Sequence, residues 1–275
     1  FNIQDVFPDA AITTGAITNA HVIRVARWLE VTSYKRSDAV TVLSEDLREN
    51  VVAKVGPRRG AAVRVIPNFV LTDEIRPLDR MTAYRAELGI GTEPVVMYAG
   101  NVGFSQSLDL VLAAAAALPD ATFVINGDGS ARAELENRAR GRTNVRFGDY
   151  QPMDRLAEVL ATADVHVVPL RAGLGRVSVP SKTYSILAAG RPVVAAIDPG
   201  TEVPRILAAA GCGLAVAPDD APEFIAAVRT LLADSSAREA MGRRGREWVE
   251  QAASPAAVGA AYEGLVRELA ATRRR

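Results

Sequence analysis

The stretch from Pro94 to Leu135, PVVMYAGNVGFSQSLDLVLAAAAALPDATFVINGDGSARAEL, decides the fold of this chain. Its apolar run at 95–99 has the length and β-branched content of a buried strand, and residues 107–118 have the length and composition of a helix. A second strand-like run at 122–126 and a second helix-like segment from Ser130 repeat the pattern. Units of this kind build a parallel sheet with helices on both faces.

The same alternation continues toward the C-terminus, so we expect an α/β fold with a doubly wound, Rossmann-like domain over residues 73–251. Upstream, DAVTVLS and AVRVIPN predict two further parallel strands. Residues 1–72 are therefore expected to form a partial second Rossmann-like domain and a proline-containing linker. Residues 252–275 predict a C-terminal helix that packs back on the N-terminal domain. Because the chain begins at Phe1 without a methionine, in a segment typical of the inside of a domain, we expect a fragment whose true start is missing.

Composition excludes several classes of protein. The chain has 32 basic and 32 acidic residues, so no general field would attract a nucleic acid. The two histidines are far apart and Cys212 is alone, which argues against a metal site and excludes an internal disulfide. A lone cysteine suits a reducing cytosol. No apolar run is long enough to cross a bilayer, so we expect a cytoplasmic protein that touches membrane at most on its surface.

Ligands of open parallel sheets bind beyond the carboxyl ends of the strands. Gly100 and Gly103 follow the first strand of the opening stretch, where they could bring backbone N–H groups to a phosphate or simply form a tight turn. Gly127 and Gly129 follow the second strand and are explained most readily as a turn. Tyr150 follows the third, where it could stack on a nucleotide base or cover the edge of the core.

The clearest signal is the loop RAGLGRVSVPSK, residues 171–182. It contains Arg171, Arg176 and Lys182 and no acidic residue, an arrangement that is unfavourable unless an anion joins the cations or they point into solvent. Lys182 falls in the first turn of a predicted helix, where the helix dipole disfavours a cation. Ser181 could cap that helix and donate to a phosphate oxygen. Lys182 is one of only three lysines in the chain.

Two other polar residues have structural explanations beside functional ones. His166 alternates with valines in a predicted strand and is expected to be a half-buried structural histidine. Glu202 begins a predicted helix, where it could complement the helix dipole or contact a sugar hydroxyl. The sequence shows no Ser–His–Asp or Cys–His set and no carboxylate cluster spaced for a metal.

The segments RSDAVTVLSEDLRENV, VRVIPNFV, YAGNVG, GDGSARAEL, ADVHVVPL, SVPSKTYSILAAGRPVVA and AGCGLAVAPDD follow one another in an order that resembles retaining glycosyltransferases of family 4, which have the two-domain GT-B fold. The form SVPSKTYSILAAGRP is most similar to bacterial enzymes that build capsule, colanic-acid-like or O-antigen polysaccharide, including fucose and N-acetylfucosamine transferases. The resemblance implies metal-independent, retaining transfer from a nucleoside diphosphate sugar to a glycan or lipid-linked acceptor. It implies no cofactor beyond this donor, and it leaves open a cytoplasmic protein with or without peripheral contact with the inner membrane surface.

The resemblance also implies a donor site. We expect Lys182 and Arg171 to act on the diphosphate, and the donor to be bound by Gly100, Asn101, Gly103, Gly127, Gly129, Tyr150, Ser181, Tyr184, Ser185 and Glu202.

Four charged residues that are usual in the family are absent from this sequence. Val177 and Ser185 stand where the family has glutamates, and Asn101 and Gln106 stand where it has an arginine and a lysine. We therefore predict that the cationic contact has moved across the cleft to the Lys182 loop. The departures also leave open a non-catalytic nucleotide-binding or partner-binding module. An epimerase acting on a nucleotide sugar would need catalytic acids, for which the chain offers few candidates.

Overall fold

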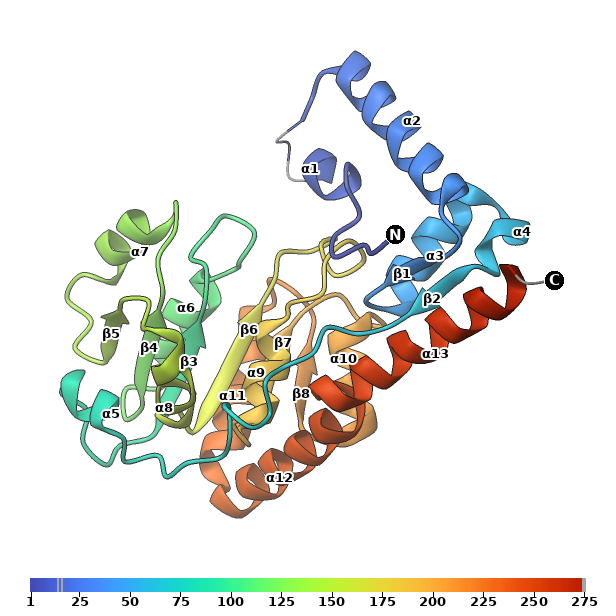
Figure 1. The fold of residues 1–275 in the computed structure, drawn as a ribbon. Coiled ribbons are helices and arrows are strands. Elements are labelled where there is room, and N and C mark those ends of the chain that lie inside the picture. Colours follow the sequence, from blue (N-terminus) through green and yellow to red (C-terminus); the bar gives the residue numbers. More distant parts are fainter. Residues whose placement is uncertain (14, 16, 274–275) are drawn as a thin grey trace.

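The computed structural model describes residues 1–13, 15 and 17–273, which form a larger and a smaller lobe (Figure 1). The larger lobe is built on a sheet of six described strands, all parallel, in the order β5-β4-β3-β6-β7-β8. These are β3 (Val95–Ala99), β4 (Thr122–Asn126), β5 (Val145–Gly148), β6 (Val165–Pro169), β7 (Val193–Ala196) and β8 (Gly213–Val216). The chain moves outward on both sides of the central β3–β6 pair, so the sheet is doubly wound, as the sequence predicts.

Helices bury both faces of this sheet. Val96 and Tyr98 face a core formed with α6 (Asp109–Ala117), α7 (Arg132–Ala139) and α11 (Ala221–Ala233). Val95 and Met97 point to the opposite face, because successive strand residues alternate. That face is covered by α5 (Ala83–Glu87), the 3₁₀ turn η1 (Met153–Arg155), α8 (Leu156–Ala161), α9 (Lys182–Ala188), α10 (Glu202–Ala210) and α12 (Ser235–Ala252). Burial on both faces explains why the strands are continuous apolar runs.

The smaller lobe contains the parallel strands β1 (Val40–Val42) and β2 (Val63–Val65). The N-terminal residues lie beside β1, where Ile3 N–H donates to the Thr41 carbonyl at 2.8 Å. The surrounding helices are α1 (Asp9–Thr13), α2 (Ala20–Arg36), α3 (Glu45–Val55) and α4 (Pro57–Gly60). Ser44 caps α3 by accepting from Leu47 N–H at 3.2 Å. The first turn of α3 contains two acidic residues, Glu45 and Asp46, which the helix dipole favours there.

The two lobes share one hydrophobic core. Leu43 of the smaller lobe belongs to the same cluster as Val168 and Val177 of the larger lobe. The final helix, α13 (Pro255–Arg273), runs beside β2 (Figure 1), and Arg64 pairs with its Glu268 at 2.9 Å. Within the described residues, no helix combines the length and apolar content that a membrane crossing requires.

Candidate functional site

The glycine loops that follow β3, β4 and β5 lie against one another at the carboxyl edge of the larger sheet. Gly127 N–H donates to the Gly148 carbonyl at 2.9 Å. A Cβ atom at Gly127 would lie 2.0 Å from the Gly100 carbonyl oxygen, and one at Gly129 would lie 2.4 Å from the Val102 carbonyl oxygen. Close packing of backbone on backbone therefore requires glycine at both positions.

The amides of Gly100 and Gly103 already have partners. Gly100 N–H donates to the Asn126 carbonyl at 2.9 Å, and Gly103 N–H donates to the Gln106 side chain at 3.0 Å. Phosphate binding by these glycines would require free amides, but in this structure both amides are already hydrogen-bonded. Gly100 instead leaves room for the Lys182 side chain, because a Cβ atom at this position would lie 2.7 Å from the Lys182 Nζ.

The Lys182 side chain reaches from the first turn of α9 to the end of β3. Its Nζ donates to the Tyr98 hydroxyl at 2.6 Å and lies 4.0 Å from the centre of the Tyr98 ring. The Tyr98 hydroxyl in turn donates to the Asn101 carbonyl. This chain of contacts fixes the ammonium group at the junction of the β3 and β6 loops.

No carboxylate of a described residue lies within 4.0 Å of the Lys182 ammonium. Burial lowers the pKa of Lys182 from 10.5 to about 7, because a charge is poorly solvated there. Burial also raises the pKa of Tyr98, so this hydroxyl stays neutral. A cation that lacks a protein counter-ion in such a place is stabilised by a bound anion.

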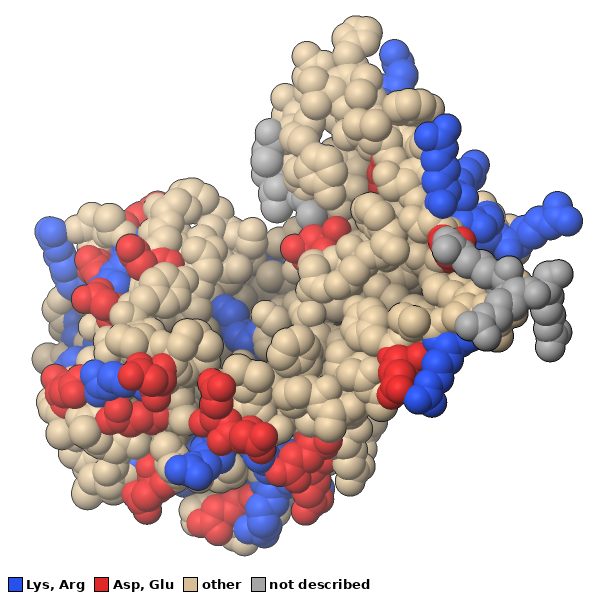
Figure 2. All heavy atoms as spheres, in the orientation of Figure 1, with Lys and Arg blue, Asp and Glu red and all other residues tan. Residues whose placement is uncertain are grey.

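Lys182 lines a cavity of about 260 Å³ between the lobes, which we call the Lys182 pocket. Figure 2 shows the hollow between the lobes, with a basic group at its floor. The larger lobe contributes Gln106 and residues 168–170 and 178–182; the smaller lobe and the linker contribute Gln4, Asp5, Leu43 and Asn68. Asp5 supplies the one carboxylate among the described residues of the lining. Sequence patterns did not single out Gln4 or Asp5, since only folding brings them opposite Lys182.

Arg171 lies outside the Lys182 pocket. Its Nε donates to the Phe104 carbonyl at 2.5 Å, and its backbone N–H donates to the Ser105 carbonyl at 3.0 Å. It lines a separate cavity of about 210 Å³ that meets the Lys182 pocket only at Gln106. Arg176 is exposed. Neither of the two loop arginines therefore lines the Lys182 pocket.

Carboxylates from neighbouring strand ends hold the 171–181 loop by its backbone. Asp198, which follows β7, accepts from Gly173 N–H at 2.9 Å and from Gly175 N–H at 2.9 Å. Asp219, which follows β8, accepts from the Ser107 hydroxyl and from Ala172 N–H at 3.4 Å. The loop contains no acid in sequence, but two acids fix its conformation in the fold.

Of the other predicted residues in or beside α9, Ser181 lines the pocket, whereas Tyr184 and Ser185 do not. Ser181 stands at the N-cap position and lines the pocket, but its backbone is helical and its side chain makes no capping bond, so the predicted cap is wrong. Tyr184 is 1 % exposed and stacks on Trp248 with ring centres 6.0 Å apart. Ser185 is partly buried and does not line the pocket.

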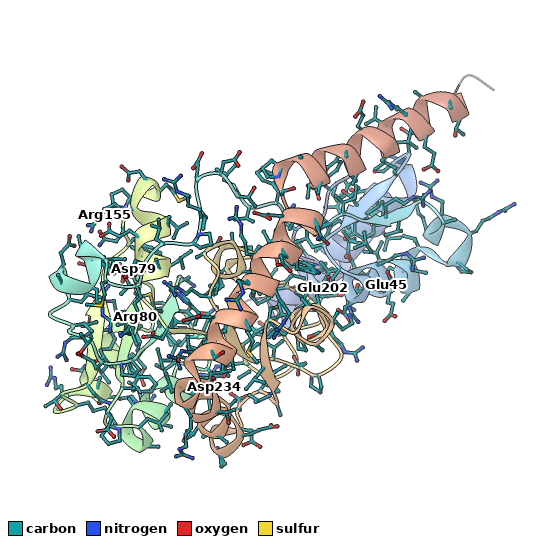
Figure 3. The ribbon with its side chains drawn as sticks, turned by 90° about the horizontal axis from the view of Figure 1, so that it is seen from below. Glu45, Asp79, Arg80, Arg155, Glu202 and Asp234 are labelled. Carbon is teal, nitrogen blue, oxygen red and sulfur yellow. The ribbon has the colours of Figure 1, made fainter. Side chains whose placement is uncertain are left out.

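Glu202 begins α10 and belongs to an ion cluster between the lobes. It pairs with Arg205 at 3.2 Å, and Arg205 makes two bonds to Asp46 of α3, at 2.6 and 3.3 Å. Figure 3 shows Glu202 close to Glu45, where the lobes meet. Burial raises the pKa of Glu202. The contacts of Glu202 therefore help to join the two lobes, through Arg205 and Asp46.

Tyr150 is 56 % exposed, with its hydroxyl 3.5 Å from the Asp128 carbonyl. It therefore does not cover the core, and its hydroxyl contacts the glycine loop after β4. Arg132 joins this loop to the next, because its Nη1 donates to the Gly127 carbonyl at 2.6 Å and to the Gly148 carbonyl at 3.3 Å.

His166 is fully buried, not half-buried as expected. Its Nε2 lies 2.8 Å from the Leu160 carbonyl, and burial lowers its pKa to about 4, so it is neutral at physiological pH. No group of three or more potential metal ligands occurs among the described residues.

Comparisons with known proteins agree with this architecture. The family model described as "Glycosyl transferases group 1" matches residues 93–234. The chain is 27% identical over 224 residues to the "Probable glycosyltransferase WbjE" of Pseudomonas aeruginosa, covering 79% of this chain and 56% of the relative. It is 28% identical over 247 residues to the "Putative colanic acid biosynthesis glycosyl transferase WcaI" of Escherichia coli K12, covering 84% and 59%. The chain thus spans somewhat more than half the length of these relatives.

Solved structures show the same fold at low identity. Sucrose-phosphate synthase of Thermosynechococcus elongatus has a TM-score of 0.80 at 21% identity, covering 98% of this chain and 67% of that one. Anabaena HepE in complex with UDP and glucose has a TM-score of 0.78 at 14% identity, covering 97% and 70%. The expected GT-B type of α/β fold is therefore confirmed, and the chain belongs to the group 1 glycosyl transferase family.

Proposed function

We propose that this chain binds a nucleoside diphosphate sugar and is the donor-binding part of a bacterial glycosyltransferase. One observation carries the proposal: the Lys182 ammonium lies in an interlobe pocket at the carboxyl edge of the sheet, hydrogen-bonded to Tyr98 and without a carboxylate partner among the described residues. Family membership supports it, as does the similar fold of HepE, whose structure was solved in complex with UDP and glucose.

In the proposed reaction, the protonated Lys182 stabilises the negative charge that develops on the departing diphosphate. A fixed cation in a partly dehydrated cleft stabilises such charge more than water does. The bound diphosphate also keeps the ammonium protonated, since a nearby anion raises the pKa of a lysine. Transfer would proceed with retention and without a metal, as the resemblance to family 4 implies.

The acceptor would enter from the smaller lobe, where Gln4 and Asp5 line the Lys182 pocket. The names of the relatives WbjE and WcaI point to cell-surface polysaccharide, so we propose a glycan or lipid-linked glycan as the acceptor class. A lipid-linked acceptor would place the protein at the cytoplasmic face of the inner membrane. A fucose or N-acetylfucosamine donor remains our proposal from the resemblance.

A second candidate is a non-catalytic nucleotide-binding module. It is favoured by Val177 and Ser185, which stand at the positions of the family's glutamates; Val177 is buried and has no polar group to offer. Incubation with a panel of radiolabelled nucleotide sugars separates the candidates. Hydrolysis or transfer supports the enzyme, whereas binding without turnover supports the module.

Calorimetric titration with UDP and with GDP tests the donor site. Lys182→Ala should weaken binding of the preferred nucleotide by about 1.5–3 kcal/mol, the usual contribution of a hydrogen bond to a charged group. Lys35→Ala is the matched control, because Lys35 is exposed on α2. Equal affinities for the wild type and Lys182→Ala would refute the assignment.

A further inference from the structure

A cavity of about 540 Å³ lies at the amino ends of β3, β6 and β7, where it is lined by Pro94, Asp164 and Pro192. The Lys182 pocket lies at the opposite end of β6, where Pro169 and Leu170 line it. Since a strand rises about 3.3 Å per residue, β6 separates the two by roughly 15 Å. The described linings have no residue in common. This cavity, which we call the arginine cavity, is therefore distinct from the proposed donor site.

Arginine dominates the described lining, which includes Arg80, Arg191, Arg238, Arg243 and Arg246 against the acids Asp164, Glu239 and Glu247. Ser235, Glu239, Arg243 and Glu247 recur at every fourth position of α12, so one face of this helix forms a wall. The segment between β2 and α5, which joins the lobes and which we call the linker, also contributes to the lining, through Pro77 and Arg80. Figure 3 shows Arg80 well away from the Glu202 and Glu45 junction.

The described lining carries a net positive charge, with five arginines against three acids. Arg80 pairs with Asp164 at 2.8 Å, and Arg246 pairs with Glu250, which does not line the cavity. By contrast, no described carboxylate lies within 4.0 Å of the guanidinium groups of Arg191, Arg238 and Arg243. Three guanidinium groups without acidic partners therefore converge on one cavity.

Backbone carbonyls hold these groups in place without removing their charge. Arg191 Nη2 donates to the Leu78 carbonyl at 2.8 Å and to the Ala161 carbonyl at 2.7 Å, while its buried Nε has no partner among the described residues. Arg238 Nη1 donates to the carbonyls of Leu231 and Leu232. Guanidinium groups fixed in this way are preorganised for an oxyanion, which accepts from their planar fork of donors.

We propose that the arginine cavity binds a small phosphate-type oxyanion at the junction of α12 and the interlobe linker. Arg243 supplies one contact, since it is exposed and makes no hydrogen bond or ion pair with the described residues. Arg191 supplies a fixed contact that also holds the linker through the Leu78 carbonyl. Because Arg191 also holds the Leu78 carbonyl, such an anion would bind beside the contact between the linker and the larger lobe.

The test is calorimetric titration of inorganic pyrophosphate into the Lys182→Ala protein, which lacks the cation of the proposed donor site. We expect saturable binding to one site. Adding Arg243→Ala should weaken it at least about tenfold, as expected for loss of a charge-assisted contact. Adding Arg229→Ala instead should leave the affinity unchanged, because Arg229 is exposed on α11 and does not line the cavity. Thermal unfolding should show that both variants remain folded.

Three results would overturn the proposal: no saturable binding to the Lys182→Ala protein, unchanged affinity after Arg243→Ala, or equal losses in the Arg243 and Arg229 variants. The last result would indicate a general effect of net charge. Because the background already lacks Lys182, none of these results depends on the donor-site assignment.

Discussion

Lys182 is one of three lysines in the chain, and its ammonium group reaches from α9 to the hydroxyl of Tyr98 at the end of β3. The sequence predicts that this lysine is unusual, because it lies in a cationic loop at the carboxyl edge of a sheet. It does not predict Tyr98 as the partner, since the two residues are 84 positions apart and meet only because β3 pairs with β6. The isolation of the charge is likewise a property of the fold.

The role of Gly100 can be tested against another glycine. Gly100→Ala places a methyl group at φ +137° and 2.7 Å from the Lys182 Nζ, whereas Gly141→Ala places one at φ +81° in open space. Both should lose about 1–3 kcal/mol of stability from backbone strain. Only Gly100→Ala should also weaken UDP or GDP binding, measured by calorimetry on folded protein. Equal nucleotide affinity in the two variants would show that Gly100 does not serve the Lys182 site.

At the scale of elements, the apolar runs predict the strands of the larger sheet because burial on both faces leaves little choice of residue. The same logic explains why Tyr184 does not line the Lys182 pocket: it lies on the face of α9 that carries Leu187 and Ala188, and all three are buried. The helical spacing of Tyr184, Leu187 and Ala188 in the sequence already predicts that they share a buried face. The anchoring of the 171–181 loop could not be predicted, because Asp198 and Asp219 come from other strand ends.

We predict that Asp198→Ala loosens this loop without unfolding the sheet. Three bonds to the amides of Gly173 and Gly175 would be lost, so hydrogen exchange should accelerate over residues 172–177 while the strand amides stay protected. Nucleotide affinity should fall by a few-fold, because Lys182 ends the same loop. Asp198→Asn keeps one acceptor oxygen and should recover part of the protection. Unchanged exchange in Asp198→Ala would mean that other contacts hold the loop.

At the scale of the whole molecule, the alternation of strands and helices predicts two α/β units, and the GT-B fold agrees. The contacts that fix one lobe against the other could not be predicted, because they join residues far apart in sequence. Asp46 of α3 and Arg205 of α10 are 159 positions apart, and Asp46 is buried whereas the Arg205 side chain is 42 % exposed.

This difference in exposure predicts an asymmetry between two substitutions. Arg205→Ala leaves the buried carboxylate of Asp46 unpaired and should cost about 3 kcal/mol of unfolding free energy. Asp46→Ala leaves an arginine that water can solvate and should cost only about 1 kcal/mol. Denaturant unfolding of both variants and of the double variant measures the pair. A larger loss for Asp46→Ala would contradict this account of the junction.

The pH dependence of nucleoside diphosphate binding tests the Lys182 assignment most directly. Below its free-state pKa of about 7 the ammonium is charged and ready to bind the anion; above it, binding must take up a proton, so affinity falls as pH rises. Between pH 6.5 and 8.5 the wild-type affinity should fall roughly tenfold or more, with proton uptake in buffers of different ionisation enthalpy. Lys182→Ala should show a weak affinity that lacks this fall. Wild-type and Lys182→Ala titrations with the same pH dependence would contradict the central claim that Lys182 binds the diphosphate.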